Sequence, residues 1–392
     1  MPIFDQGYQH WSGTLTSHSW RWLAIARHGV RIGMKNRLLR IALMLAGLPA
    51  IGLAEPLCVW GLLEQKSEIV APLVPFLSSI FGPEIVADPK AYRVEVWTLC
   101  YDLFLLTELR FSMILILLVG PGLISQDLRF NALPLYFSRP LRRIDYFVGK
   151  LGVVVYFLGL VLVAPSIIAY VLGLLFSLDI TIIRDTFTLL LAAIGYGILI
   201  SLSAGLFILA LLSLTRSSRY VGLFWLAVWF VSGITSLVLS AIHEEENRRM
   251  YHQRMAEAYQ AQMAEEARQN KDAPEPAGPK KGKQRFPTVR QDVERQIRAE
   301  VTQHQIEAAK HYWRPMVSFT ANFSRIGQHW LGTDRCWERL SQNEPEEQRD
   351  QFLLENKGPQ YPWYWSAILL TILFGISVCI LNFRVKSLDR LR

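Results

Sequence analysis

Charged residues and catalytic motifs are both scarce in this sequence. Of its 392 residues 19% are charged, against about 25% in average soluble proteins, and the mean hydropathy is +0.22. The chain lacks a Gly-x-x-x-x-Gly-Lys-Ser/Thr phosphate loop, a His-Glu-x-x-His motif and a Cys-x-x-Cys pair, which argues against an ATPase and against a zinc site. Its four cysteines are scattered and predict no particular disulfide. We therefore expect no catalytic residue and no metal site.

Apolar runs long enough to cross a bilayer recur along the chain. A membrane helix needs about 20 mostly apolar residues, and six stretches reach that length. They are Ile41–Leu63, Leu103–Ile124, Val153–Phe176, Thr188–Leu214, Tyr220–Ile242 and Trp363–Phe383. We predict an all-α integral membrane protein with six transmembrane helices, in which 41–242 holds the first five spans and 363–392 holds the last span and a tail.

The loops between these spans differ in charge. The net charge is +5 for residues 1–40, +3 for 125–150 and +3 for 384–392, whereas 64–96 carries −2. With six spans the basic segments fall on one side, which the positive-inside rule assigns to the cytoplasm. We expect a multi-pass protein of the cytoplasmic (inner) cell membrane with both termini in the cytoplasm. The overall charge of +8 is then a topology signal and indicates no nucleic-acid partner.

The segment 1–40 precedes the first span on the cytoplasmic side. Within it, Trp20–Arg40 alternates apolar and basic residues at helical spacing. This pattern predicts an interfacial helix whose basic side contacts membrane lipid headgroups. An ordinary basic flank of the first span is the alternative.

The connection between spans five and six, residues 243–362, is expected to be a large extracytoplasmic helical loop. Residues 243–270 are polar and helix-prone, 270–287 are rich in Pro, Gly and Lys and predict a flexible linker, and 288–311 are again helix-prone. A solvated helix pair and a docking surface for another protein are both open interpretations. The aromatic segment 313–332 is too polar to span, and favours a short re-entrant or interfacial pair of helices.

Four ionisable residues fall within or beside the first two spans. They are Glu55, Asp102, Glu108 and Arg110. We place Glu55 near the outer end of span one and the other three toward the outer end of span two. Such residues either pair and snorkel to the interface or line a polar pathway, and the sequence leaves both roles open.

Small residues repeat every four positions in span four. The stripe comprises Ala193, Gly197, Ser201 and Gly205. Small side chains let another helix approach closely. Packing within the bundle is the simpler interpretation, and a subunit interface is the alternative.

The segment between spans two and three holds the most informative pattern. Pro121-Gly122 loosens the end of span two, and 126–143 then mixes apolar and polar residues as a short amphipathic element at the membrane surface. Arg139-Pro140 stops this element, and Gly149-Lys150 leads into the next span. An element placed there can receive force from a cytoplasmic partner and pass it to spans two and three.

This segment resembles the permease subunit of type-2 ABC transporters of the exporter class. In that family an acidic cluster follows the second span, and an Arg-Pro, an Arg and a Gly-Lys lead into the third; Asp127, Arg139-Pro140, Arg143 and Gly149-Lys150 stand in those places. The resemblance implies that 126–143 is a coupling helix touching a separate ABC ATPase subunit. The contact residues it implies are Asp127, Arg129, Phe130, Leu133, Arg139, Pro140 and Arg143. The sequence departs from the family in its reduced acidic pair, Gln126-Asp127, and in its large 243–311 insertion.

The expected function is that of a membrane permease subunit of an ATP-driven exporter, not itself an enzyme. The resemblance implies that ATP and Mg are bound by the partner ATPase, with no cofactor bound directly, and that the permease forms a homodimer or a heterodimer with a related permease. The alternative is a membrane-anchored scaffold or signalling protein acting through 243–362. The sequence leaves the cargo and the identity of the ATPase open.

Overall fold

The computed structural model describes residues 20–124, 127, 130, 142–215, 217–272, 302–303, 306, 309, 311–358 and 361–389. The regular structure in this part of the chain is helical, and no strand occurs in it. The α-helices are α1 (Arg21–Gly33), α2 (Arg37–Leu45), α3 (Leu48–Glu64), α4 (Val74–Phe81), α5 (Pro83–Ala87), α6 (Arg93–Val119), α9 (Arg143–Ser177), α10 (Thr181–Leu214), α11 (Ser218–Asp272), α13 (Phe319–Leu331), α14 (Thr333–Leu340), α15 (Glu346–Asn356) and α16 (Trp363–Asp389).

Six helical segments among the described residues are long and apolar enough to cross a membrane. They cover Arg37–Glu64, Arg93–Gly122, Ile144–Ser177, Thr181–Leu214, Ser218–Glu257 and Trp363–Phe383. The predicted all-helical, multi-pass membrane protein with six spans is confirmed. Several helices begin earlier than the apolar runs do, because polar residues at these ends find partners within the protein. The clearest case is α6, which begins at Arg93 rather than at Leu103.

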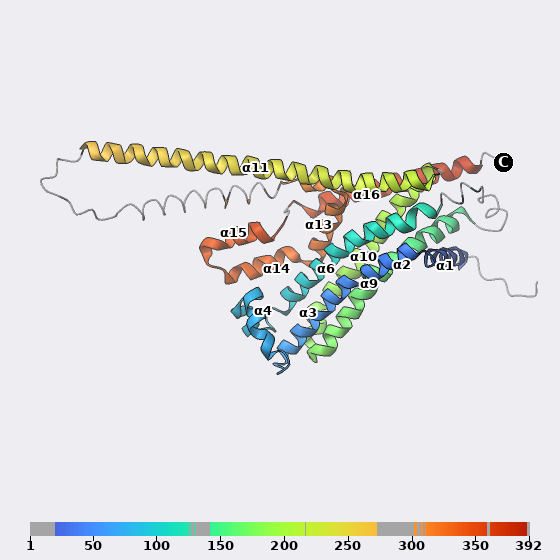
Figure 1. The fold of residues 1–392 in the computed structure, drawn as a ribbon, viewed down its shortest axis with the longest axis horizontal. Coiled ribbons are helices and arrows are strands. Elements are labelled where there is room, and N and C mark those ends of the chain that lie inside the picture. Colours follow the sequence, from blue (N-terminus) through green and yellow to red (C-terminus); the bar gives the residue numbers. More distant parts are fainter. Residues whose placement is uncertain are drawn as a thin grey trace, which may run out of the picture.

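The interior of the bundle is built by α6, α9 and α10, with α3 packed against α6 and α9 (Figure 1). Trp97, Tyr101 and Tyr196 are buried there. The Tyr101 hydroxyl donates to the main-chain oxygen of Ser166 at 2.8 Å. Because a buried hydroxyl without a partner is costly, this bond favours one register of α6 against α9.

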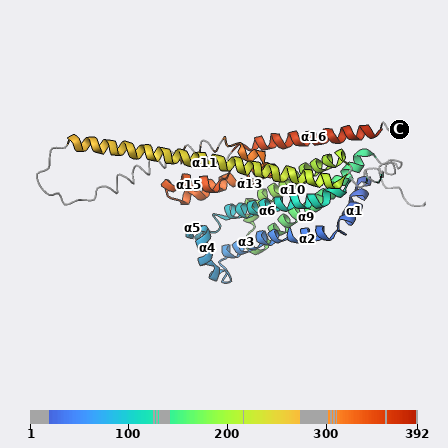
Figure 2. The same cartoon turned by 45° about the horizontal axis from the view of Figure 1, so that its top comes forward.

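The helical region before the first span is divided in two. α1 ends at Gly33, and α2 begins after Asn36, whose side-chain oxygen accepts from the Leu38 amide at 3.0 Å and so caps the new helix. α1 packs on α9, whereas α2 leads into α3 (Figure 2). The helix predicted over 20–40 was therefore drawn too long, because Arg37 and Arg40 belong to the first membrane segment.

α11 is one uninterrupted helix of 55 residues, about 80 Å long at 1.5 Å per residue. Its first part lies beside the bundle, and its second part projects well beyond it (Figure 1). The helix of the fifth span thus runs without a break into the polar segment. The predicted linker 270–287 and the predicted returning helix 288–311 lie almost entirely outside the described residues.

Helix α13 is packed inside the bundle, against α6, α10 and α16. Its Phe319, Phe323 and Ile326 side chains are buried. Ser318 caps its start by accepting from the Ala321 amide at 3.3 Å, and Gly332, with φ of 75°, ends it in a backbone conformation that glycine adopts without strain. The aromatic segment before the last span is therefore one α-helix packed against the spans, preceded by the short 3-10 helix Arg314–Val317 and followed by the separate helix α14.

Helix α14 lies against the start of α6. The Arg339 guanidinium is 2.8 Å from the buried Glu95 carboxylate and donates to the Ala91 main-chain oxygen at 2.8 Å. The Tyr92 hydroxyl donates to Asn343 Oδ1 at 2.9 Å. These contacts hold the segment after α13 onto the end of α6.

The two ends of the bundle carry different parts of the chain. α1 and the C-terminal end of α16 lie at one end, whereas α4, α5, α14 and α15 lie at the other (Figure 1). An even number of spans produces this arrangement. The basic helix α1 and the C-terminal end of α16 therefore share one end of the described part of the molecule.

Candidate functional site

Asp127, Tyr146 and Lys150 meet where the chain passes from α6 to α9, and we call them the junction cluster. The Tyr146 hydroxyl donates to Asp127 Oδ2 at 2.6 Å, and Lys150 Nζ lies 2.7 Å from the same oxygen. Lys150 Nζ also lies 5.4 Å from the centre of the Tyr146 ring, within cation–π range. The Lys150 and Asp127 side chains are only 12% and 16% exposed. Removal of either partner therefore leaves a largely buried charge, which is costly.

α1 is docked on the same turn of α9 through two glycines. A Cβ atom at Gly149 would lie 2.7 Å from Ile25 Cβ and 2.9 Å from the Trp22 main-chain oxygen, and one at Gly152 would lie 3.2 Å from Ala26 Cβ. The close approach of α1 to α9 at Gly149 is possible only because this residue has no side chain. α1 and the junction cluster are therefore connected through one turn of α9.

Two positions of the permease-like motif, Asp127 and Lys150, are thus brought together. Phe130 is 74% exposed. Arg143 is the first residue of α9, but its side chain lies outside the described part. The rest of the predicted coupling helix lies outside the described residues, including Arg129, Leu133, Arg139 and Pro140.

Glu108 lies near the centre of α6, fifteen residues after its start, and not near its outer end as predicted. Its carboxyl group is fully buried, and neither oxygen has a hydrogen-bond partner among the described residues. The Ser112 hydroxyl, one turn further, is in the same situation. Arg110 is exposed and forms no pair with Glu108. Glu108 is therefore a polar group kept in the core at an energetic cost.

Asp102 and Arg110 lie beside two cavities between α6 and α13. The cavity at Asp102 measures about 10 Å³, room for about one water molecule. The cavity at Arg110 measures about 270 Å³. Ser324 and Leu106 line both. The seam between α6 and α13 thus contains polar side chains among apolar ones within the span.

Glu55 differs from these residues because it is exposed, on α3, nine residues before that helix ends. The end of this helix differs by one residue from the predicted end of the first span at Leu63, so Glu55 keeps the place in the span that was predicted for it. No hydrogen bond or ion pair to another described residue involves it.

The small-residue stripe of α10 lies against α9 of the same chain. A Cβ atom at Gly197 would lie 2.8 Å from Val163 Cγ2, and one at Gly205 would lie 2.8 Å from Leu151 Cδ1. The Ser201 hydroxyl donates back to the Gly197 main-chain oxygen at 2.7 Å. The stripe is therefore occupied within the bundle.

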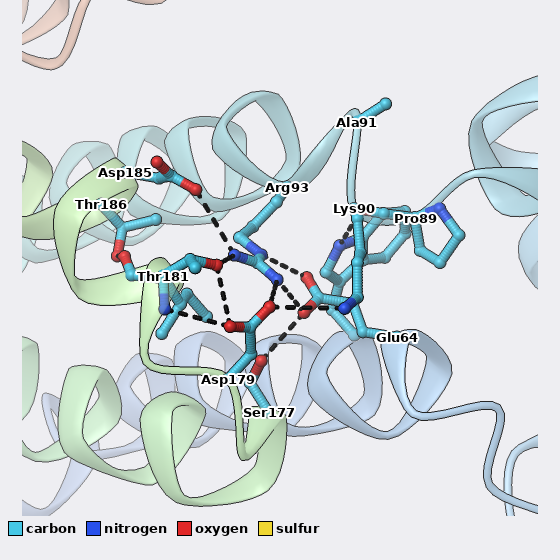
Figure 3. A network of polar contacts seen from close by, with 12 residues as sticks. Glu64, Pro89, Lys90, Ala91, Arg93, Ser177, Asp179, Thr181, Asp185 and Thr186 are labelled. Carbon is cyan, nitrogen blue, oxygen red and sulfur yellow. Dashed lines mark hydrogen bonds and ion pairs between the residues drawn. The ribbon is translucent and has the colours of Figure 1, made fainter.

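A network around Arg93 ties α3, α6 and α10 together at the end opposite the junction cluster (Figure 3). Arg93 is 2% exposed and donates through Nε and Nη2 to the two Glu64 oxygens at 2.7 and 2.6 Å. It also donates to Asp179 at 3.0 Å, Thr181 Oγ1 at 3.2 Å and Asp185 at 3.4 Å. The two-bond contact with Glu64 uses the planar fork of arginine, which lysine lacks.

The end of α9 is fastened to the same network. The Ser177 hydroxyl donates to Glu64 Oε2 at 2.9 Å, and the Gln65 side-chain amide donates to the Phe176 main-chain oxygen. A Cβ atom at Gly61 would lie 2.8 Å from the carbonyl carbon of Phe176. Glycine at this position lets the α3 and α9 backbones touch.

Asp179, in the turn between α9 and α10, is the member of this network that accepts the most hydrogen bonds from the start of α10. Its carboxylate accepts from the Thr181 amide at 3.0 Å and from the Thr181 hydroxyl at 2.8 Å. These two bonds, and then the bond from Arg93, hold the pKa of Asp179 well below its ordinary value of 3.8. The charged form is therefore the one that the network stabilises.

The sequence does not predict the Arg93 network, because Glu64 and Arg93 contribute to the prediction only as charges of the loop 64–96, and Asp179 does not enter it. The available signal was their position at the ends of apolar runs. Glu64 ends the first run, Arg93 precedes the second, and Asp179 separates the third from the fourth. Spans that alternate in direction bring these ends to one side of the bundle.

No protein-family model matches the chain, and no curated protein matches it. The class of protein that the helices define is a helical, multi-pass membrane protein.

Proposed function

We propose that this protein is the permease subunit of an ATP-driven exporter in the cell membrane. The observation that best supports this function is the junction cluster, in which Asp127 and Lys150 of the permease-like motif form an ion pair at the α6–α9 connection. A segment that receives force needs a firm attachment to the spans. A mostly buried ion pair reinforced by the Tyr146 hydroxyl provides one.

In this mechanism two permease chains, identical or related, bind two ABC ATPases on the cytoplasmic side. The ATPases hold ATP and Mg²⁺, and their closure presses on 126–143. Asp127 passes the load to α9 through Lys150, and α1 follows because it is docked at Gly149. ATPase closure favours one arrangement of the spans over another, and this difference in stability moves the substrate outward.

The test is purification in mild detergent from the native membrane, followed by assay of bound ATPase activity. We expect an ATPase in stoichiometric amount. Asp127→Asn removes the ion pair but retains an acceptor for Tyr146, and Lys150→Met removes the cation. Both are expected to leave ATP hydrolysis active while lowering substrate-stimulated turnover about tenfold or more, as expected for loss of a charge-assisted contact of about 1.5–3 kcal/mol.

Gly159→Ala is the matched control, because it lies on α9 and a Cβ atom there meets no neighbour within 4 Å. It is expected to behave as wild type. The proposal is contradicted if no ATPase copurifies with a protein whose spans stay folded. It is also contradicted if substrate-stimulated turnover is unchanged in both Asp127→Asn and Lys150→Met.

A scaffold function is the second hypothesis, favoured by the projecting part of α11 (Figure 1). In that case the extracytoplasmic part 243–362 binds the partner and the spans are an anchor. Deletion of 270–287 separates the two functions. A scaffold loses all function, whereas an exporter retains ATPase binding at the opposite end of the bundle.

A further inference from the structure

The charged residues that line the 270 Å³ cavity between α6 and α13 are two arginines, Arg110 and Arg325. None of the described residues that line it is acidic. The polar lining residues are Arg110, Thr320, Ser324, Arg325 and Gln328, and the remainder are Leu106, Leu109, Ala321 and Tyr361. The neighbouring acid, Asp102, lines the adjoining small cavity instead.

Arg325 is a fixed part of the cavity wall. It is 6% exposed, and its Nε donates to the Tyr361 main-chain oxygen at 2.8 Å. Its Nη1 and Nη2 atoms lie 3.2 and 3.1 Å from the Asp334 carboxylate oxygens. Asp334 balances its charge and fixes its orientation, while a guanidinium with five N–H groups retains donors beyond these three contacts.

Arg110 is the cation of this cavity without a counter-charge. It lies seventeen residues after Arg93 and nine before Val119 on α6, about 25 and 14 Å from the two helix ends. No hydrogen bond or ion pair to another described residue involves its side chain. An arginine at this depth of a span is expensive and commonly marks a ligand pathway.

We propose that the cavity binds the oxyanion group of an anionic amphiphile, with Arg110 as its charge partner and Thr320, Ser324 and Gln328 as neutral donors. The volume is below the roughly 300–1,000 Å³ of pockets that enclose drug-sized ligands. It therefore fits a headgroup, while the apolar tail lies along the outer surface of the spans. Resting on the proposed export function, this chemistry makes anionic amphiphiles the class of cargo.

Native mass spectrometry of the full-length protein, without ATP and without an ATPase, tests the site. The protein is mixed with equal amounts of phosphatidylglycerol and phosphatidylcholine. We expect wild type to retain the anionic lipid about tenfold more strongly. Arg110→Gln is expected to lose this preference, and Arg110→Lys to keep part of it. Ala321→Phe, which fills the cavity and leaves both arginines in place, is expected to lose it as well.

Arg184→Gln is the matched control, because Arg184 is exposed on α10 and does not line the cavity. Its lipid preference is expected to match that of wild type. Equal retention of both lipids by wild type overturns the proposal, and so does an undiminished preference in both Arg110→Gln and Ala321→Phe.

Added inorganic phosphate distinguishes the source of the oxyanion. Competition with phosphatidylglycerol supports a site where the oxyanion alone suffices and a soluble phosphate ester is a ligand. Absence of competition, with the Arg110 dependence retained, supports a lipid headgroup whose tail is required. Because the measurement needs neither ATP nor an ATPase, its failure is distinct from failure of the export function.

Discussion

The charged residues of the bundle differ in how completely they are neutralised. Arg93 is surrounded by three carboxylates, and Lys150 has one, Asp127. Arg110 has no carboxylate partner among the described residues, and the Glu108 carboxyl group has no hydrogen-bond partner among them. The neutralised charges fix helices to one another, whereas the unpartnered ones hold no helix in place. At a position without a partner, a bound ligand can supply the missing hydrogen bond or counter-charge.

The Asp179 carboxylate is expected to make stability depend on pH. Asp179→Asn keeps an oxygen that accepts from Thr181 but loses the charge facing Arg93 and Lys90. Because the folded-state pKa of Asp179 is lowered, its stabilising effect is complete above its ordinary pKa and disappears as the pH falls toward the lowered value. Thermal unfolding curves are therefore expected to show the variant less stable than wild type at about pH 7, with the difference shrinking below about pH 4.

Asp185→Asn is the control for this comparison. Asp185 is 43% exposed and lies 3.4 Å from Arg93, so a smaller effect at neutral pH is expected. A gap between wild type and Asp179→Asn that stays constant down to acid pH would show that the charge of Asp179 does not stabilise the network.

At the scale of elements, the tightest point of the contact between α1 and α9 is at Gly149. Gly149→Ala places a methyl group 2.7 Å from Ile25 Cβ and 2.9 Å from the Trp22 main-chain oxygen. Overpacking of this kind costs about 1–3 kcal/mol, so we expect a lower melting temperature and, if the proposed export function holds, weaker coupling to the proposed ATPase. Gly159→Ala, on the open side of the same helix, is expected to be neutral or stabilising by up to about 1 kcal/mol. Equal melting temperatures for the two variants would contradict a close α1–α9 contact.

Sequence reasoning located most elements but not all of their ends. An apolar run shows where a helix meets lipid, so it missed the first ten residues of α6, in which Arg93 and Glu95 are buried against other parts of the protein. Hydropathy also classified the segment of α13 as too polar to span. That helix is buried nonetheless, because protein surrounds it and Arg325 has Asp334 as a partner. Burial by protein rather than by lipid leaves no hydropathy signal.

At the scale of the whole molecule, the six spans predict which segments are accessible from each side. We expect Gln342→Cys, in the turn after α14, and Arg219→Cys, at the start of α11, to lie on opposite sides, since both positions are exposed and occupy different ends of the bundle. After replacement of the four native cysteines, a membrane-impermeant maleimide is expected to label only Gln342→Cys in intact cells. Permeabilised cells are expected to label both, and labelling of Arg219→Cys alone would invert the topology.

The candidate sites were predictable to different degrees. The pairing partners Asp127 and Lys150 are close in sequence, and a motif brought both to attention. The Arg93 network and the α6–α13 cavity join residues that are far apart in the chain, such as Arg93 with Asp179 and Arg110 with Gln328. The α6–α13 cavity exists only because α13 packs among the spans, which the sequence does not show.

The continuity of α11 turns a small rotation into a large displacement. The thirty residues from His243 to Asp272 form a rod about 45 Å long that shares one axis with the fifth span. A change of about 10° in the tilt of that span therefore swings the tip of the rod through about 8 Å. The distance between a spin label at the tip of α11 and one on the bundle would therefore report the conformation of the membrane domain, without a label at the moving spans themselves.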